Sequence, residues 1–453
     1  MAADRPGGPT RDRVTILLLV AALIGVPGAI LRSTCGAGCA AAEAAPARVP
    51  FCTLPGELRA RIAAGFRDGR SPDVVAVPRD ATVVGSVSPT GARTVDGVWP
   101  STARALDTRV PIVFAGIGVR AGAPVPDGTA LRQIAPTVAQ ALAFERPFPQ
   151  VRSGRAVAGV ARPERPRLVM QVVWKDVGTA DLAADRRAWP TLRRLLAHGA
   201  GTLDGDAGSL PLDPAAALTT IGTGGTPAEH GIVGTWLRDD RGAVIRAWSG
   251  GAPTSVIATL ADDLDEAFGQ RPEIALVGTD AADRGIVGRA WYARTDRDPA
   301  VIAGRPAVRM RAVERLLTQG LGRDRIPDLL AVVGEGPVRR LDDELARIVR
   351  LAREASGGSL LIVVTATGSP GTPDGPLTAG ELVRALEQGA VTEGRLVEAA
   401  TSGGIFLDRR TLGREEVPGS TVVDALLATT GPDGTPLFAD VFQGFAVSFG
   451  RYC

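Results

Sequence analysis

The sequence contains several short, mostly continuous apolar runs separated by amphipathic segments. The runs fall at residues 73–77, 110–115, 167–174, 273–278, 328–333 and 360–365. An uninterrupted apolar run of this length is typical of a strand that is buried on both faces. The sequence therefore predicts an α/β fold in which helices cover both faces of a central, mostly parallel sheet.

The segments between the runs carry the helical periodicity that such a fold needs. Helices are predicted at residues 57–66, 189–198, 215–221, 255–268, 308–319 and 341–355. In the last of these, the apolar residues form one stripe and the acidic residues 342–344 face outward, so this acidic run is expected to be a solvated helix start. Asp262, Asp263, Asp265 and Glu266 are likewise expected to be charges on a helix surface.

Composition narrows the class of protein. The chain has 453 residues, 45% of them hydrophobic and 22% charged, which is typical of a globular protein. The net charge is +2, and Lys175 is the only lysine. No basic helix or patch of basic and aromatic residues appears, so nucleic acid is not an expected partner.

Residues 210–236 carry the most specific motif, LPLDPAAALTTIGTGGTPAEHGIVGTW. This segment resembles the signature of the alkaline phosphatase superfamily, in particular its type I phosphodiesterase and nucleotide pyrophosphatase branch. The shared pattern T-G-x-x-P-x-x-H-G-I is found at Thr223, Gly224, Pro227, His230, Gly231 and Ile232. The resemblance implies a loop that presents a Ser or Thr nucleophile at the start of a helix, beside two metal ions.

The nucleophile of that signature is missing. When the family motif is aligned on residues 215–218, Asp213 and Pro214 stand where the hydroxyl residue belongs. Proline has neither a hydroxyl group nor an N–H.

The histidines that the family uses as metal ligands are also missing. The chain has two histidines, His198 and His230, whereas the family usually uses three histidines as metal ligands. His198 precedes Gly199 and is expected in the last turn of a helix. In the family, the histidine that corresponds to His230 is commonly structural.

The strands that carry the other ligand motifs of the family end differently here. Run 167–174 continues into Lys175 and Asp176 instead of Asp-Gly, and Asp176 is expected to point away from the site. Run 328–333 leads to Glu335, and run 360–365 leads to Thr367 instead of Asp-His-Gly. The resemblance thus predicts a vestigial pocket without a metal or other cofactor, formed by Asp176, Asp213, Pro214, Thr223, His230, Glu335 and Thr367.

The order of the resemblance is unusual. Residues 71–155 resemble the final third of the same superfamily, so the end of the family fold precedes its beginning. We interpret the chain as a circular permutant. Residues 52–160 correspond to the C-terminal part of the family fold and residues 166–453 to its N-terminal part, with a cap-like subregion at about 371–450.

The N-terminal region predicts export from the cytoplasm. A polar head at residues 1–13 precedes residues 14–31, an 18-residue run without a charge, and the flanking arginines favour a cytoplasmic head. The run is either an uncleaved transmembrane anchor or a signal peptide cleaved near the small residues 40–42. Either interpretation places the large domain outside the cytoplasm, after an Ala/Gly/Pro-rich spacer at residues 32–51. The protein is thus expected at the cell membrane as a single-pass protein, or secreted after cleavage.

Four cysteines in an exported chain favour disulfide bridges. Cys35 and Cys39 follow the apolar run and fit a lipoprotein motif poorly. The permutation implies that the two ends of the domain lie close together. It therefore implies a bridge between Cys52 and Cys453.

Two weaker candidates have simpler interpretations. The loop at residues 222–226 is Gly-rich but lacks the lysine of a P-loop. Residues 279–285 follow a predicted strand and could hold a ligand through Asp280, Asp283 and Arg284, although an ordinary strand-to-helix turn also accounts for them.

Two functions remain open. The first is a catalytically inactive, membrane-tethered phosphatase-like protein that binds an envelope glycan, a phospholipid headgroup or another protein. The second is a residual phosphoester hydrolase that uses Asp213 and Asp176 with a metal held by carboxylates alone. The first is favoured because a dinuclear centre without imidazole ligands would be unusual.

Overall fold

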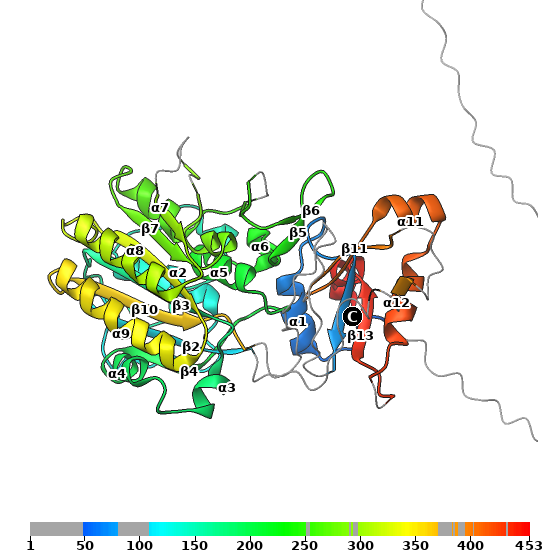
Figure 1. Cartoon of the computed structure of the whole chain (residues 1–453), viewed down its shortest axis with the longest axis horizontal. Coiled ribbons are helices and arrows are strands. Elements are labelled where there is room, and N and C mark those ends of the chain that lie inside the picture. Colours follow the sequence, from blue (N-terminus) through cyan, green and yellow to red (C-terminus); the bar gives the residue numbers. More distant parts are fainter. Residues whose placement is uncertain are drawn as a thin grey trace, which may run out of the picture. The chain divides into compact units, whose positions relative to one another are not determined.

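The structure is a computed structural model, and it describes residues 49–79, 108–250, 254–289, 291–292, 298–369, 383, 386–387, 395–401, 403–431 and 434–453 (Figure 1). All of them belong to one compact unit, Val49–Cys453. The apolar run at residues 14–31 lies outside the described residues. Among the helices within the described ranges, none combines the length and the apolar character that a membrane span needs.

The centre of the fold is a seven-stranded sheet. Its strand order is β4 (Ala200–Asp206), β2 (Arg109–Gly116), β10 (Leu360–Ala366), β3 (Leu168–Lys175), β9 (Asp328–Glu335), β7 (Ile274–Gly278) and β8 (Ala300–Ile302). The pairs from β10 to β8 are parallel, whereas β2 is antiparallel to both of its neighbours. The predicted α/β fold with a large, mostly parallel sheet is confirmed.

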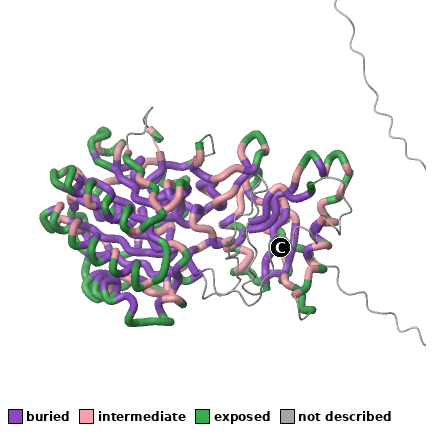
Figure 2. Tube along the Cα trace, viewed as in Figure 1, coloured by how far each residue is buried: buried purple, intermediate pink, exposed green. Residues whose placement is uncertain are grey.

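The strands of this sheet are covered on both faces. Every residue of β10 is buried, and so is every residue of β3 except the last (Figure 2). Because both faces of these strands are buried, nearly every residue in them is apolar. The sequence therefore predicted these strands within about two residues.

The helices fall into two packed groups, which can be followed in Figure 1. In one group, α9 (Val338–Ala355) contacts both α4 (Pro190–His198) and α8 (Pro306–Gln319). In the other, α2 (Ile134–Ala141), α5 (Pro214–Thr223) and α7 (Leu260–Ala267) contact one another. Short helices α3 (Thr179–Ala184) and α6 (Pro227–His230) complete this part of the fold.

Helix α7 begins later than predicted. The predicted helix starts at residue 255, but α7 starts at Leu260 because Thr259 caps it. The Thr259 hydroxyl accepts the Asp262 N–H at 3.2 Å, and the Asp262 carboxylate accepts the Thr259 N–H at 2.8 Å. This reciprocal capping box fixes the first turn.

A second, four-stranded sheet is antiparallel throughout. Its order is β11 (Val397–Thr401), β12 (Gly404–Leu407), β1 (Val74–Pro78) and β13 (Phe438–Gln443), and helices α11 (Arg409–Glu415) and α12 (Gly419–Leu427) accompany it. The expectation that residues 73–77 complete the large sheet is therefore wrong. Strand β1 is hydrogen-bonded on both sides by strands from the end of the chain, so its backbone groups are satisfied here.

The two ends of the compact unit meet. Cys52 and Cys453 form a disulfide that joins positions 401 residues apart, with their Cα atoms 5.2 Å from each other. Beside it, the Phe51 N–H donates to the Asp440 carboxylate at 2.9 Å, and the Phe51 ring packs edge-on against Phe442. Helices α1 (Gly56–Gly65) and α13 (Phe445–Phe449) flank this junction.

Several acidic residues expected on helix surfaces are buried instead. Asp342 of α9 accepts the backbone N–H groups of Thr191 and Leu192, both at 2.9 Å, and so caps the start of α4. Asp263 is completely buried and pairs with Arg146 at 2.6 Å and Arg152 at 3.1 Å. These expectations were wrong because the partners come from distant segments that helical periodicity cannot identify.

Candidate functional site

Charged side chains gather at the carboxyl ends of three neighbouring parallel strands. Lys175 ends β3, Glu335 ends β9, and Thr279 directly follows β7. The Lys175 Nζ donates to Thr279 Oγ1 at 3.0 Å and to Asp283 Oδ1 at 3.2 Å, and lies 3.9 Å from Glu335 Oε2. This edge of an α/β sheet is where such folds bind ligands, which makes the cluster the candidate site.

The Lys175 ammonium is a permanent cation of this cluster. Burial alone would lower the pKa of Lys175, but the Asp283, Asp280 and Glu335 carboxylates outweigh burial and raise it. The side chain is 12% exposed. A fixed positive charge thus lies among the carboxylates that end the sheet.

Asp283 organises the turn after β7. Its carboxylate accepts the N–H groups of Thr279 at 2.7 Å and Asp280 at 3.0 Å, as well as the Thr279 hydroxyl. Asp280 caps the short helix η3 (Ala281–Ile286) by accepting the Ala282 N–H at 2.8 Å, and it pairs with Arg246 of strand β6 (Val244–Arg246). Both carboxylates of residues 279–285 therefore serve the ordinary strand-to-helix turn.

Asp176 follows Lys175 directly, at the carboxyl end of β3. Its backbone has a φ of 57°, in the left-handed region, and its N–H donates to the Thr367 hydroxyl at 2.9 Å. The residue reaches the surface, but packing around the carboxyl group raises the pKa of Asp176 to about 6. Lys175 opposes the rise, while the charges of Asp213 and Glu335 add to it.

Asp213 caps helix α5, and both of its carboxylate oxygens are engaged. Oδ1 accepts the N–H groups of Ala215 at 2.8 Å and Ala216 at 3.4 Å, and Thr235 donates its N–H to Oδ2 at 2.9 Å and its hydroxyl to Oδ1 at 3.1 Å. Burial raises the pKa of Asp213, and these hydrogen bonds oppose the rise. Pro214 follows as the first residue of the helix, where its missing N–H costs nothing. The helix N-terminus, which suits an anion, is thus occupied by the chain's own carboxylate.

His230 lies away from this cluster and is held as a neutral ring. It is completely buried, its Nδ1 accepts the Ile232 N–H at 3.1 Å, and its Nε2 lies 3.0 Å from the Thr220 hydroxyl. Since Nδ1 is an acceptor, the proton of the neutral ring is on Nε2. Burial, aided by Arg67 and Arg70, lowers the pKa of His230 to about 3.

Thr223 also lies outside the cluster. It ends α5, roughly 15 Å along the helix axis from Asp213. Its hydroxyl donates to the Thr219 carbonyl at 2.7 Å. In the following loop, the Gly225 N–H donates to the Thr223 hydroxyl and the Thr226 N–H to the Glu229 carboxylate. These donors have internal partners, so the Gly-rich loop does not serve as a phosphate cradle.

His198 is exposed at the end of α4, as the sequence predicted. Its Nδ1 lies 2.9 Å from the Arg194 carbonyl oxygen. The structure thus places Asp176 beside Thr367, and Glu335 beside Lys175. Asp213 and Pro214 begin α5, Thr223 ends it, and His230 contacts Thr220 of the same helix.

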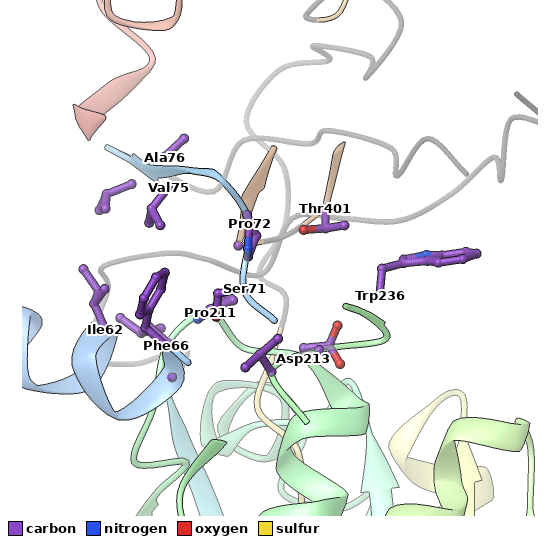
Figure 3. Close-up of a pocket in the computed structure, with 16 residues that line it drawn as sticks. Ile62, Phe66, Ser71, Pro72, Val75, Ala76, Pro211, Asp213, Trp236 and Thr401 are labelled. Atoms are coloured by element: carbon purple, nitrogen blue, oxygen red, sulfur yellow. The ribbon is translucent and has the colours of Figure 1, made fainter. Parts of the chain in front are cut away.

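A small cavity of about 40 Å³ borders Asp213 (Figure 3). Its walls are mostly apolar and come from α1, β1, residues 210–211 and residues 233–236, including Ile62, Phe66, Val75, Ala76, Pro211, Val233 and Trp236. Sequence reasoning missed this cavity, because none of these segments carries a pattern that distinguishes a cavity wall from ordinary core.

The donor set does not fit the two-metal centre that the family resemblance implies. Throughout the ranges that the structure describes, no three His, Cys, Asp or Glu side chains are arranged to hold a metal ion. The cluster at the sheet edge contains carboxylates and an ammonium group but no imidazole.

Comparisons with known proteins give distant similarities. No family model and no curated protein matches the chain. Among solved structures, it is similar to wild-type alkaline phosphatase PafA, with a TM-score of 0.44 and 15% identity over 58% of this chain and 76% of that one. It is also similar to phosphonoacetate hydrolase from Sinorhizobium meliloti 1021, with a TM-score of 0.36 and 18% identity over 61% of this chain and 80% of that one. Both neighbours are members of the alkaline phosphatase superfamily. No residue role follows from similarities this distant.

Proposed function

We propose that this protein is a catalytically inactive, alkaline phosphatase-like and type I phosphodiesterase-like protein that acts outside the cytoplasm by binding. The state of Asp213 carries the proposal. It stands at the position of the family nucleophile, and both of its oxygens accept hydrogen bonds from α5 and Thr235. A carboxylate in that position leaves no place for a phosphoryl group at the helix N-terminus.

Lys175 supports the same conclusion. Its ammonium group neutralises the acidic cluster from 3.2 Å and 3.9 Å, so a divalent cation would have to approach against a fixed positive charge. An inactive pocket of this kind is suited to binding a neutral or amphipathic envelope ligand, or a partner protein.

The proposal includes a circularly permuted order. Strand β2 and helix α2 come from the first third of the chain, yet β2 pairs with β10 from near residue 360 in the large sheet. The disulfide between Cys52 and Cys453 links the ends of the compact unit. These contacts support an order in which the family's late elements have moved to the front.

The proposal also includes a membrane tether at residues 14–31. Its support is the 18-residue run without a charge, flanked by arginines on its N-terminal side. The spacer that follows would connect the tether to the domain at Val49.

A residual phosphoester hydrolase is the second candidate. The position of Asp176 at the carboxyl end of β3 favours it, together with burial, which raises the pKa of Asp176 to about 6. A carboxyl group that titrates near neutral pH can act as a general acid or base.

Hydrolysis assays on the purified full chain separate the two candidates. The substrates are a generic phosphodiester and a generic phosphomonoester with added zinc, magnesium or manganese, and the variants are Asp213→Ala, Asp176→Asn and Asp343→Ala on the exposed face of α9. Rates at background for all four proteins are expected. Turnover by the wild type and Asp343→Ala, with loss in Asp176→Asn or Asp213→Ala, would establish the hydrolase instead.

A further inference from the structure

Four large apolar side chains are exposed around the disulfide. Val49 is 54% exposed, Phe445 58%, Phe449 60% and Tyr452 72%. The three aromatic side chains form the aromatic patch, and Val49 is three residues from Cys52 of the same disulfide. A soluble surface usually carries such side chains singly, and a cluster of them marks an interaction site.

The side chains of the aromatic patch are held in place by the residues on which they pack. The Phe445 and Phe449 ring centroids are 6.3 Å apart, and those of Phe449 and Tyr452 are 6.5 Å apart. The opposite face of α13 is buried through Val447, and Cys453 is fixed by the disulfide. The aromatic rings are therefore presented in a fixed arrangement, which lowers the entropic cost of binding.

The patch lies where the chain enters the compact unit. Val49 lies near the end of the spacer at residues 32–51, and 17 residues, 32–48, separate it from the apolar run at residues 14–31. Seventeen residues reach at most about 60 Å. A domain on this tether meets the bilayer at a high effective concentration.

We propose that the aromatic patch inserts into the interfacial region of the lipid bilayer that holds the tether, and so fixes the domain against the membrane surface. This inference rests on the proposed tether. Aromatic side chains favour the membrane–water interface, where a tyrosine ring lies in the apolar layer and its hydroxyl stays in water.

The size of the patch argues for a bilayer over a second protein copy. Three aromatic side chains at these exposures offer on the order of 400 Å². A stable protein–protein interface buries about 800 Å² on each partner. A weak contact of this size becomes effective when a tether already holds the surface nearby.

The test uses the full chain with a protease recognition sequence inserted in the spacer between Ala42 and Glu43. The protein is reconstituted in vesicles of phosphatidylglycerol and phosphatidylethanolamine, the spacer is cut, and the vesicles are floated. The wild-type domain is expected to stay largely with the vesicles. The triple variant Phe445→Ser, Phe449→Ser and Tyr452→Ser is expected to lower the ratio of bound to released domain on the order of tenfold or more.

Phe148→Ser is the matched control, because Phe148 is 61% exposed but far along the chain from this junction. It is expected to behave as the wild type. Retention of the Cys52–Cys453 bridge shows that each variant is folded. Release of the cut wild-type domain from the vesicles would by itself contradict membrane insertion.

The outcomes separate this inference from the proposed function. If the uncut chain does not float, the tether is wrong and the inference fails with it. If the uncut chain floats but the cut wild-type domain is released, the inference fails while the tether stands. Release of the wild-type domain as a dimer, with a monomeric triple variant, would assign the patch to a second copy and overturn membrane insertion.

Discussion

At the level of single residues, polar groups in and near the candidate site serve the fold. Asp213 caps a helix, Asp283 organises a turn, and His230 holds the loop after α6. The sequence could predict that His230 is structural, because His230 lies in a recognisable motif. It could not predict the position of Lys175 among three carboxylates, since Asp283 and Glu335 are 108 and 160 positions further along the chain.

The neutral state of His230 predicts a loss of stability in acid. An unfolded histidine takes up a proton near pH 6.5, whereas the folded protein excludes it until about pH 3. The unfolded state therefore binds more protons in this window, and the free energy of unfolding falls as the pH drops through it. Between pH 7 and pH 4.5, the contribution of His230 is expected to fall by about 3 kcal/mol.

Denaturant unfolding at these two pH values measures this effect. His230→Asn, whose side-chain oxygen can accept the Ile232 N–H, is expected to lose less stability in acid than the wild type. His198→Asn, at the exposed histidine, is the control. Equal acid dependence in the wild type and His230→Asn would contradict a neutral, buried ring.

At the level of elements, prediction succeeded where burial leaves a local trace. Strands β3, β7, β9 and β10 are buried on both faces, so each is an apolar run that sequence alone reveals. The sheet to which β1 belongs could not be predicted, because its partners β12 and β13 lie more than 300 residues away. The partners of Asp263 and Asp342 could not be predicted either, because they are also far away along the sequence.

The cap that Asp342 provides for α4 predicts a large, specific loss of stability. Asp342→Ala leaves the buried N–H groups of Thr191 and Leu192 without acceptors, which is expected to cost about 2 to 4 kcal/mol. Asp343→Ala removes the neighbouring exposed carboxylate and is expected to stay within about 0.5 kcal/mol of the wild type. Urea unfolding of both variants tests the cap, and equal effects would show that Asp342 does not provide it.

At the level of the whole molecule, contacts between distant segments attach one short strand to the four-stranded sheet. Arg238, in strand β5 (Trp236–Arg238), donates to Glu398 at 2.9 Å and to the Leu407 carbonyl at 2.7 Å, and pairs with Asp73. The sequence predicted the bridge between Cys52 and Cys453 through the permuted order, and the structure contains it. Nothing in the local pattern around Arg238 could have predicted its partners.

The bridge is expected to contribute strongly to stability. Chain entropy alone assigns about 6 kcal/mol, as an upper value, to a loop of this length. Replacing both Cys52 and Cys453 with serine is therefore expected to lower the unfolding midpoint markedly. Peptide mapping without reduction should recover the two cysteines joined. Free thiols, or Cys52 joined to Cys35 or Cys39, would contradict the circularly permuted order, in which the two ends of the compact unit are joined.

The metal content of the purified full chain tests the inactive state most directly. The proposal predicts less than stoichiometric zinc by elemental analysis and an unfolding temperature that chelators leave unchanged, because Lys175 occupies the acidic cluster and no histidine reaches it. Two tightly bound metal ions per chain, with a loss of stability on chelation, would contradict it.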